Sequence, residues 1–81
     1  MTTLDKIAVG ERVRVFSLGT AGEMRRRLLD LGVVEGTVIE CVGRSPLGDP
    51  SAFLLRGAVV ALRKDDTAKI YVERGGADGT H

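Results

Sequence analysis

Residues 11–44, ERVRVFSLGTAGEMRRRLLDLGVVEGTVIECVGR, contain a strand pattern, a helix pattern and a second strand pattern in succession. Within residues 11–16, Val13 and Val15 alternate with arginines, which predicts a strand with one buried face. Residues 37–44 are rich in side chains that favour β-structure, and they predict a second strand. This segment therefore indicates a mainly β fold in which one helix is inserted between two strands.

The inserted helix is expected over residues 20–31. Thr20 and Glu23 have the spacing of a capping box, in which each side chain satisfies the other residue's backbone N–H. Gly32 is well placed to end the helix in a left-handed conformation. One stripe of the helix is apolar, which predicts the face that packs on the core. The stripe consists of Ala21, Met24, Leu28 and Leu31.

Outside this segment the chain predicts short elements joined by tight turns. A helical turn is expected over residues 3–9, with Leu4 and Ile7 on one face. Strands are expected over 51–55, 58–62 and 69–73, a hairpin turn at 56–57 and a short helical turn over 63–68. Together these elements predict one domain over residues 1–73, a small barrel of about five strands with one short α-helix. The glycine-rich residues 74–81 are expected to form a disordered tail.

Composition narrows the class of protein. The 81 residues include 12 basic and 11 acidic side chains, and this near neutrality argues against nucleic acid as a partner. Cys41 is the single cysteine, which excludes an intrachain disulfide and favours a reducing compartment. Residues 1–16 lack the apolar region of a signal peptide, and no stretch approaches the ~18 apolar residues of a membrane span. We therefore expect a cytoplasmic protein that does not insert into the membrane.

Residues that could carry out chemistry are scarce. The only histidine is His81, at the end of the tail, so a Ser/His/Asp or Cys/His arrangement has no suitable base. Cys41 is expected to be a small buried apolar side chain, and with His81 it cannot complete a metal site of about four ligands. For Asp65-Asp66, a solvated turn is favoured over weak cation binding. We expect no catalytic residues, no cofactor and no metal site within one chain, although zinc could be shared between chains.

The helix carries candidate partner-binding residues. Leu29 lies about 120° from the centre of the apolar stripe, between Arg25 and Arg26 on the helical wheel. An apolar side chain between arginines is typical of a docking patch, but an ordinary solvated face and nucleic-acid binding are alternatives. Ion pairs at i, i+4 spacing are expected between Glu23 and Arg27 and between Arg26 and Asp30.

The loop of residues 45–50, SPLGDP, allows two interpretations for Leu47. In one, Leu47 folds back to seal the barrel mouth and Asp49 caps the turn. In the other, Leu47 projects into a pocket of a partner, and the two prolines lower the entropy cost of docking. Leu47 and Asp49 therefore join Arg25, Arg26 and Leu29 as candidate partner-binding residues.

Three motifs in a fixed order carry a family resemblance: RRLLDLG at 26–32, EGT at 35–37 and SPLGDP at 45–50. Together they resemble the FeoA family, small cytosolic proteins with an SH3-like barrel that are associated with bacterial ferrous iron uptake. The resemblance implies an SH3-like fold, no catalytic residues and a role as accessory protein. The implied partner is FeoB, a membrane ferrous iron transporter with a GTP-binding domain. The resemblance leaves the oligomeric state open.

The same type of barrel also occurs as a terminal domain of iron-dependent regulators. A metal-responsive or nucleic-acid-binding SH3-like regulatory domain is therefore the alternative function. The dependence of binding on salt separates the two functions, because nucleic-acid binding weakens steeply with salt and apolar docking does not.

Overall fold

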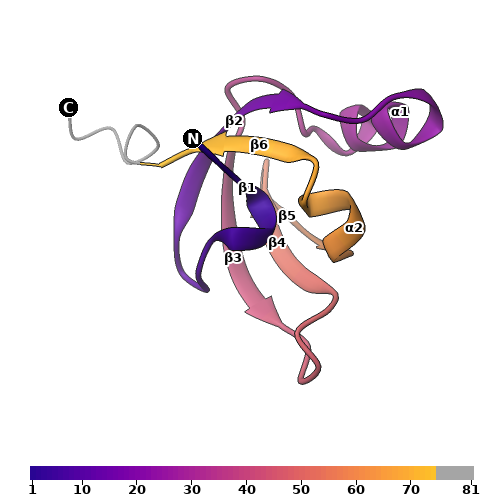
Figure 1. Ribbon diagram of the computed structural model, residues 1–81. Helices are drawn as coiled ribbons and strands as arrows, with labels where there is room; N and C mark the ends of the chain where they lie inside the picture. The colour runs from indigo at the N-terminus through magenta and orange to yellow at the C-terminus, as the bar shows by residue number, and fades with distance from the viewer. Residues whose placement is uncertain (75–81) are drawn as a thin grey trace.

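The computed structural model describes residues 1–74 (Figure 1). In chain order the elements are β1 (Thr2–Thr3), the 3₁₀ helix η1 (Leu4–Lys6), β2 (Arg12–Leu18), α1 (Gly22–Leu31), β3 (Val38–Arg44), β4 (Ser51–Leu55), β5 (Ala58–Leu62), α2 (Lys64–Thr67) and β6 (Ile70–Glu73). The expected mainly β fold with one inserted helix is confirmed. The sheet has six strands and not about five, because Thr2 and Thr3 form an additional strand, β1, that pairs with β6. Residues 75–81 of the expected tail lie outside the described residues.

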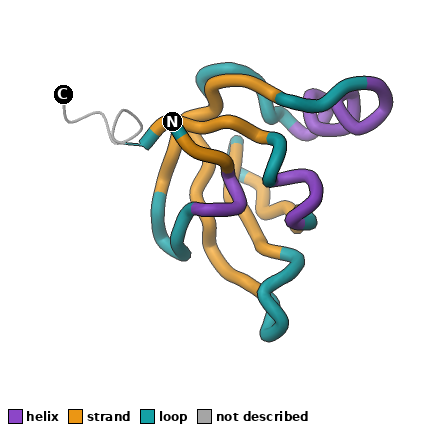
Figure 2. Tube along the Cα trace, in the orientation of Figure 1, coloured by secondary structure: helices purple, strands orange, loops and turns teal. Residues whose placement is uncertain are grey.

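The six strands form one antiparallel sheet in the order β1-β6-β2-β3-β4-β5. The register shifts between Val15 and Ser17 in β2 and between Cys41 and Gly43 in β3. Such bulges bend the bulged strand and increase its twist. The sheet curls around a single interior, with α1 projecting at one side and α2 lying between β5 and β6 (Figure 2).

The predicted alternation of the strands is confirmed in the core. Val13 and Val15 are buried, while Arg12 faces outward on the same strand. Leu4 and Ile7 are also buried on either end of η1, although the helical turn is shorter than expected. The other buried apolar side chains are Leu28, Val33, Ile39, Cys41, Phe53, Leu55, Leu62, Ile70 and Val72. Phe53 is the single large aromatic side chain in this set, so aliphatic packing dominates the interior.

The start of α1 differs from the prediction. The helix begins at Gly22, its N-cap is Ala21, and no side chain caps it, so the predicted capping box is wrong. The chain turns into the helix through Gly22 at φ 67°, which leaves Thr20 outside the first helical turn. Ala21 is consequently exposed, and the predicted stripe is reduced to buried Leu28 with partly buried Met24 and Leu31.

The end of α1 and the β4–β5 turn follow the prediction. Gly32 has φ 100°, and its N–H donates to the carbonyl of Leu29 over 3.0 Å. The next N–H, of Val33, reaches back to Leu28 over 2.9 Å, which completes a left-handed helix cap. Arg56 and Gly57 join β4 to β5, both at positive φ, as a two-residue hairpin turn requires.

Candidate functional site

The predicted partner-binding residues fall into two separate groups. Arg25, Arg26 and Leu29 lie together on α1, where they line a shallow hollow with Gly22, Glu23 and Asp30. Leu47 and Asp49 lie in the loop between β3 and β4, which projects from a different part of the barrel than α1 (Figure 1). The structure therefore presents two projecting regions and not one continuous site.

Helix α1 packs on the barrel through few side chains. Leu28 is its single buried residue, and Met24 and Leu31 pack partly against the core. The expected ion pairs of Glu23 with Arg27 and of Arg26 with Asp30 are not formed. Within residues 1–74, Arg74 forms an ion pair with Glu11. The arginine side chains on the outer side of α1 therefore have no acidic partner on the helix itself.

A second hollow lies between α1 and the end of β2, and sequence reasoning missed it. Its apolar lining includes Phe16, Leu18, Leu29 and Val33, and Arg25, Ser17 and Glu35 complete it. Phe16 is 43% exposed and Leu29 is 38% exposed, so two large apolar side chains from distant segments meet solvent at one place. Arg25 and Leu29 line both hollows and therefore lie at the centre of the surface that the two hollows form.

Phe16 takes its position from a bulge. Val15 pairs with Val72 and Ser17 with Tyr71, so Phe16 is the extra residue of β2 opposite β6. A bulge can re-aim a side chain and is common next to functional sites. The signal in the sequence was that the alternation of β2 places Phe16 on the side of Arg12 and Arg14, where a large aromatic side chain is unexpected.

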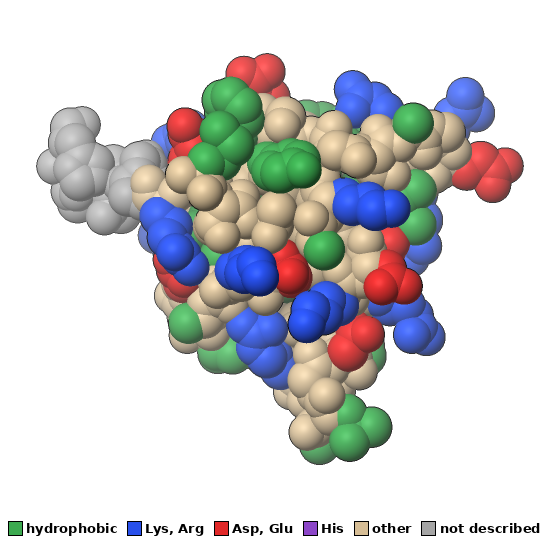
Figure 3. All heavy atoms as spheres, in the orientation of Figure 1, with side chains coloured by type: hydrophobic (Ala, Val, Ile, Leu, Met, Phe, Trp, Pro, Cys, Tyr) green, Lys and Arg blue, Asp and Glu red, His purple; other side chains and the backbone are tan. Residues whose placement is uncertain are grey.

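The 45–50 loop does not seal the barrel. Leu47 is 93% exposed. In the space-filling view, apolar side chains lie at the lower tip of the molecule, where the loop between β3 and β4 projects in Figure 1 (Figure 3). The loop closes on itself, because the N–H of Ser45 donates to Pro50 over 3.1 Å and the N–H of Gly48 donates to Ser45 over 2.8 Å. These bonds close the turn, and Leu47 at its tip lies outside the core.

Asp49 has a structural contact that differs from the expected one. Its Oδ1 accepts a hydrogen bond of 2.9 Å from the backbone N–H of Lys64, at the first residue of α2. The carboxylate therefore caps α2, across the barrel end, and does not cap its own turn. This contact ties the base of the loop to the scaffold while leaving Leu47 outside.

Candidate metal ligands do not converge in the described residues. Cys41 is buried, as expected, and its Sγ lies 3.8 Å from the carbonyl oxygen of Gly43. No group of three or more His, Cys, Asp or Glu side chains within residues 1–74 is placed to hold one ion. His81, the remaining candidate, lies outside the described residues.

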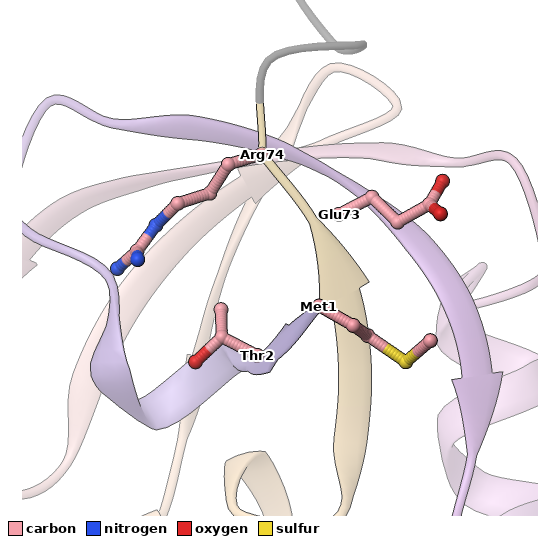
Figure 4. A pocket seen from close by; sticks show the side chains of 4 residues that line it. All are labelled: Met1, Thr2, Glu73 and Arg74. Carbon is pink, nitrogen blue, oxygen red and sulfur yellow. The ribbon is translucent and has the colours of Figure 1, made fainter.

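A further hollow lies beside β1 and the end of β6 (Figure 4). Its lining consists of Met1, Thr2, Glu73 and Arg74. Arg74 points away from Glu73 and donates from Nε to Glu11 over 2.6 Å. Arg74 also donates to the carbonyl of Lys6 over 3.3 Å. The hydrogen bonds of Arg74 therefore fix the end of β6 beside this hollow.

Among residues 1–74, no helix combines the length and the apolar character that a membrane span needs. The longest helix, α1, has ten residues and three consecutive arginines.

The domain resembles known proteins in sequence and in fold. Residues 2–74 match the model of the FeoA domain. The chain is 34% identical over 70 residues to an Fe(2+) transport protein A/Fe(2+) transporter FeoB fusion protein of Porphyromonas gingivalis. This match covers 86% of the chain and 8% of the fusion protein.

Two solved structures have the same fold. Iron(II) transport protein A from Clostridium thermocellum is 33% identical with a TM-score of 0.88, over 93% of this chain and 46% of that one. Stenotrophomonas maltophilia FeoA complexed with zinc, described as a prokaryotic SH3 domain protein, is 25% identical with a TM-score of 0.80. That match covers 90% of this chain and 91% of the other. The predicted SH3-like barrel is therefore confirmed.

A manganese-dependent transcriptional repressor also matches, at 18% identity and a TM-score of 0.79, over 89% of this chain and 40% of the repressor. At this identity the likeness concerns the fold alone. The match of residues 2–74 to the family model spans nearly the whole chain. The chain belongs to the FeoA domain family.

Proposed function

We propose that this chain is a non-catalytic cytosolic accessory protein of bacterial ferrous iron uptake that binds an FeoB-type transporter. The observation that carries the proposal is the hollow between the exposed side chains of Phe16 and Leu29, which Arg25 and Glu35 also line. The docking surface consists of this hollow and the adjoining outer side of α1 with Arg26. The transporter side of the contact is proposed to supply an apolar side chain for the hollow and carboxylates for the arginines.

The fusion relative supports this choice of partner. Its name places a transport protein A segment and an FeoB transporter in one polypeptide. A covalent link holds two modules at high effective concentration, so fusion is typical of modules that act on one another. The Stenotrophomonas maltophilia protein supports the same role, because it is described as a candidate ferrous iron transport activating factor.

The composition of the α1 surface supports docking on a protein. Interface centres are enriched in aromatic residues and arginine and are surrounded by polar groups. Phe16 and Leu29 supply the apolar centre, and Arg25 lies at its border. Because Arg25 and Arg26 make no ion pair within residues 1–74, a partner carboxylate does not have to displace an internal one.

The experiment that tests the proposal is a pair of pull-downs with the full chain. One uses the soluble GTP-binding domain of the transporter and the other uses the intact transporter in detergent. We expect specific capture by at least one of them, and the comparison locates the docking site on the transporter. Absence of capture by both, with correctly folded chain, contradicts the proposal.

A matched set of exposed apolar residues gives the control. Leu29→Ser removes the centre of the proposed surface, and Val9→Ser removes an exposed apolar side chain that lines neither α1 hollow. We expect Leu29→Ser to weaken capture and Val9→Ser to leave it unchanged. Equal effects of the two variants show that capture depends on general apolar exposure and contradict the assigned surface.

A further inference from the structure

Strand β5 is an open edge of the sheet. It pairs with β4 on one side, and the strand order places no strand on its other side within the described residues. Natural edge strands are commonly protected by charges, proline or bulges. The sequence of β5, AVVAL over Ala58–Leu62, has none of these features, and its pairing with β4 is regular.

The hairpin turn determines which backbone groups of β5 face outward. Leu55 and Ala58 flank the two-residue turn and form a hydrogen-bonded pair, so the N–H and C=O of Ala58 point toward β4. Because these groups alternate in direction along a strand, the N–H and C=O of Val59 point away from β4. By the same alternation Ala61 also directs its N–H and C=O to the open edge. In residues 1–74 neither Val59 nor Ala61 makes a backbone hydrogen bond outside the sheet. The edge therefore offers two donors and two acceptors in the spacing of a strand.

The outer face next to this edge carries exposed apolar side chains, and Glu40 of β3 lies beside them in register with Leu54. Val59 is 64% exposed and lies in register with Leu54 of β4, which is also exposed. Val42, the extra residue of the β3 bulge, is a further exposed apolar side chain on the neighbouring strand. Alternate side chains of an added strand would extend this apolar surface, as in recognition by β-augmentation.

The charges at the ends of β5 indicate which kind of segment can pair with its open edge. Arg56 lies in the hairpin turn before the strand, with its side chain beside Gly32, and Arg63 follows the strand directly. Both arginines are exposed. A second copy paired antiparallel along β5 would bring Arg56 of each chain near Arg63 of the other at both ends of the strand. Like charges brought together at an interface oppose association. A segment with acidic residues at both ends has the complementary charge.

We propose that the β5 edge binds an extended segment of another protein, with an apolar centre and carboxylates at both ends, as an added antiparallel strand. The segment bonds to the backbone of Val59 and Ala61. Its carboxylates lie near Arg56 at one end and Arg63 at the other. This site is separate from the α1 hollows, and the inference holds whether or not α1 binds the transporter.

The test uses two synthetic peptides and the full chain. The first peptide has a Thr-Val-Thr-Val-Thr centre flanked by glutamates, and the second has lysines in place of the glutamates. We expect the glutamate peptide to bind about tenfold more tightly, since several exposed charge pairs each contribute a small favourable term. In NMR titrations the amides of Val59 and Ala61 should shift and become protected from hydrogen exchange. Equal affinity of the two peptides, or unchanged Val59 and Ala61 amides, overturns the proposal.

Two substitutions at one position provide the matched control. Ala61→Pro removes an outward N–H without removing a bond to β4, and proline is tolerated at such edge positions. Ala61→Ser keeps the N–H. We expect Ala61→Pro to abolish binding of the glutamate peptide and Ala61→Ser to retain it. Binding by Ala61→Pro with wild-type affinity contradicts the proposal.

A charge reversal and a measurement of mass complete the test. Arg63→Glu should reduce the preference for the glutamate peptide, and it keeps the proposal testable if Ala61→Pro does not fold. Sedimentation equilibrium of the wild-type chain should show no dimer that depends on the β5 edge. A dimer that Ala61→Pro abolishes identifies a second copy as the occupant and overturns the assignment to an acidic segment.

Discussion

Helix α1 and the loop of residues 45–50 both project from the barrel, and each presents one exposed leucine. Leu29 shares its hollow with exposed Phe16 and partly buried Leu18, so a partner would cover several apolar side chains at once. Leu47 is 93% exposed and lines none of the hollows described above. The fold places other apolar side chains beside Leu29 but not beside Leu47, and this difference supports our proposal that docking occurs at the helix.

The two regions also differ in how they are held. The helix depends on Leu28 in the core and on the Gly32 cap, so its position is set by apolar packing and backbone geometry. The loop is held by hydrogen bonds, including the one from Lys64 to Asp49. Substitutions that remove the apolar packing of the helix should therefore lower the free energy of unfolding more than substitutions that remove the hydrogen bonds of the loop.

The largest effect is expected from Leu28→Ala. Leu28 is 1% exposed and is the one fully buried residue of α1. Its truncation should lower the free energy of unfolding by about 3 kcal/mol, within the range for buried leucines. Urea unfolding measures the loss, and Leu29→Ala at the next position is the control. A loss below about 1 kcal/mol would mean that the helix is not anchored through Leu28.

Gly32→Val should have the next largest effect. The residue has φ 100°, and a Cβ atom there would lie 2.5 Å from Cδ of Arg56. We expect a loss of about 2 kcal/mol from the left-handed backbone and the crowding together. Gly36→Val is the matched control, because Gly36 also has positive φ but has open space around it. Equal losses at the two glycines would exclude a contribution from Arg56.

Asp49→Ala tests the hydrogen bond that ties the loop to α2. Loss of the acceptor for the Lys64 N–H should cost about 1 kcal/mol, as for other helix caps. Thermal unfolding measures the change, with Asp65→Ala as the control because Asp65 lies on the exposed side of the same short helix. If both variants are equally stable, Asp49 has no capping role, and its place among the partner-binding candidates gains weight.

The smallest effect on stability is expected from Leu47→Ala. A side chain that is 93% exposed loses almost no buried area on truncation, so the change should stay within about 0.5 kcal/mol. Differential scanning calorimetry checks this expectation. A loss of about 2 kcal/mol would instead show that Leu47 packs against the barrel in solution.

Most of the fold was predictable because local physics determines it. The alternation of Val13 and Val15 gave the buried face of β2, and the left-handed cap at Gly32 followed from its place after an apolar helix. The hairpin at Arg56 and Gly57 followed from the preference of tight turns for glycine. The grouping of Arg25, Arg26 and Leu29 was likewise predictable from helical periodicity.

The remaining features depend on contacts between distant segments. Phe16 lies beside Leu29 because β2 bulges against β6, a pairing that no local pattern encodes. The bond from Lys64 to Asp49 joins residues fifteen positions apart, so the sequence alone placed Asp49 only in its own turn. Likewise, the capping box at Thr20 failed because the chain enters α1 through Gly22.

The most direct test of the α1 docking surface is the affinity of the transporter for Phe16→Ser, Leu29→Ser and the double variant. Each single change should weaken binding about tenfold. The double variant should lose less than the product of the two, because both side chains line one hollow. Leu47→Ser should bind as the wild type does. Normal affinity of the Phe16 and Leu29 variants together with weakened binding by Leu47→Ser would contradict the account and assign docking to the loop.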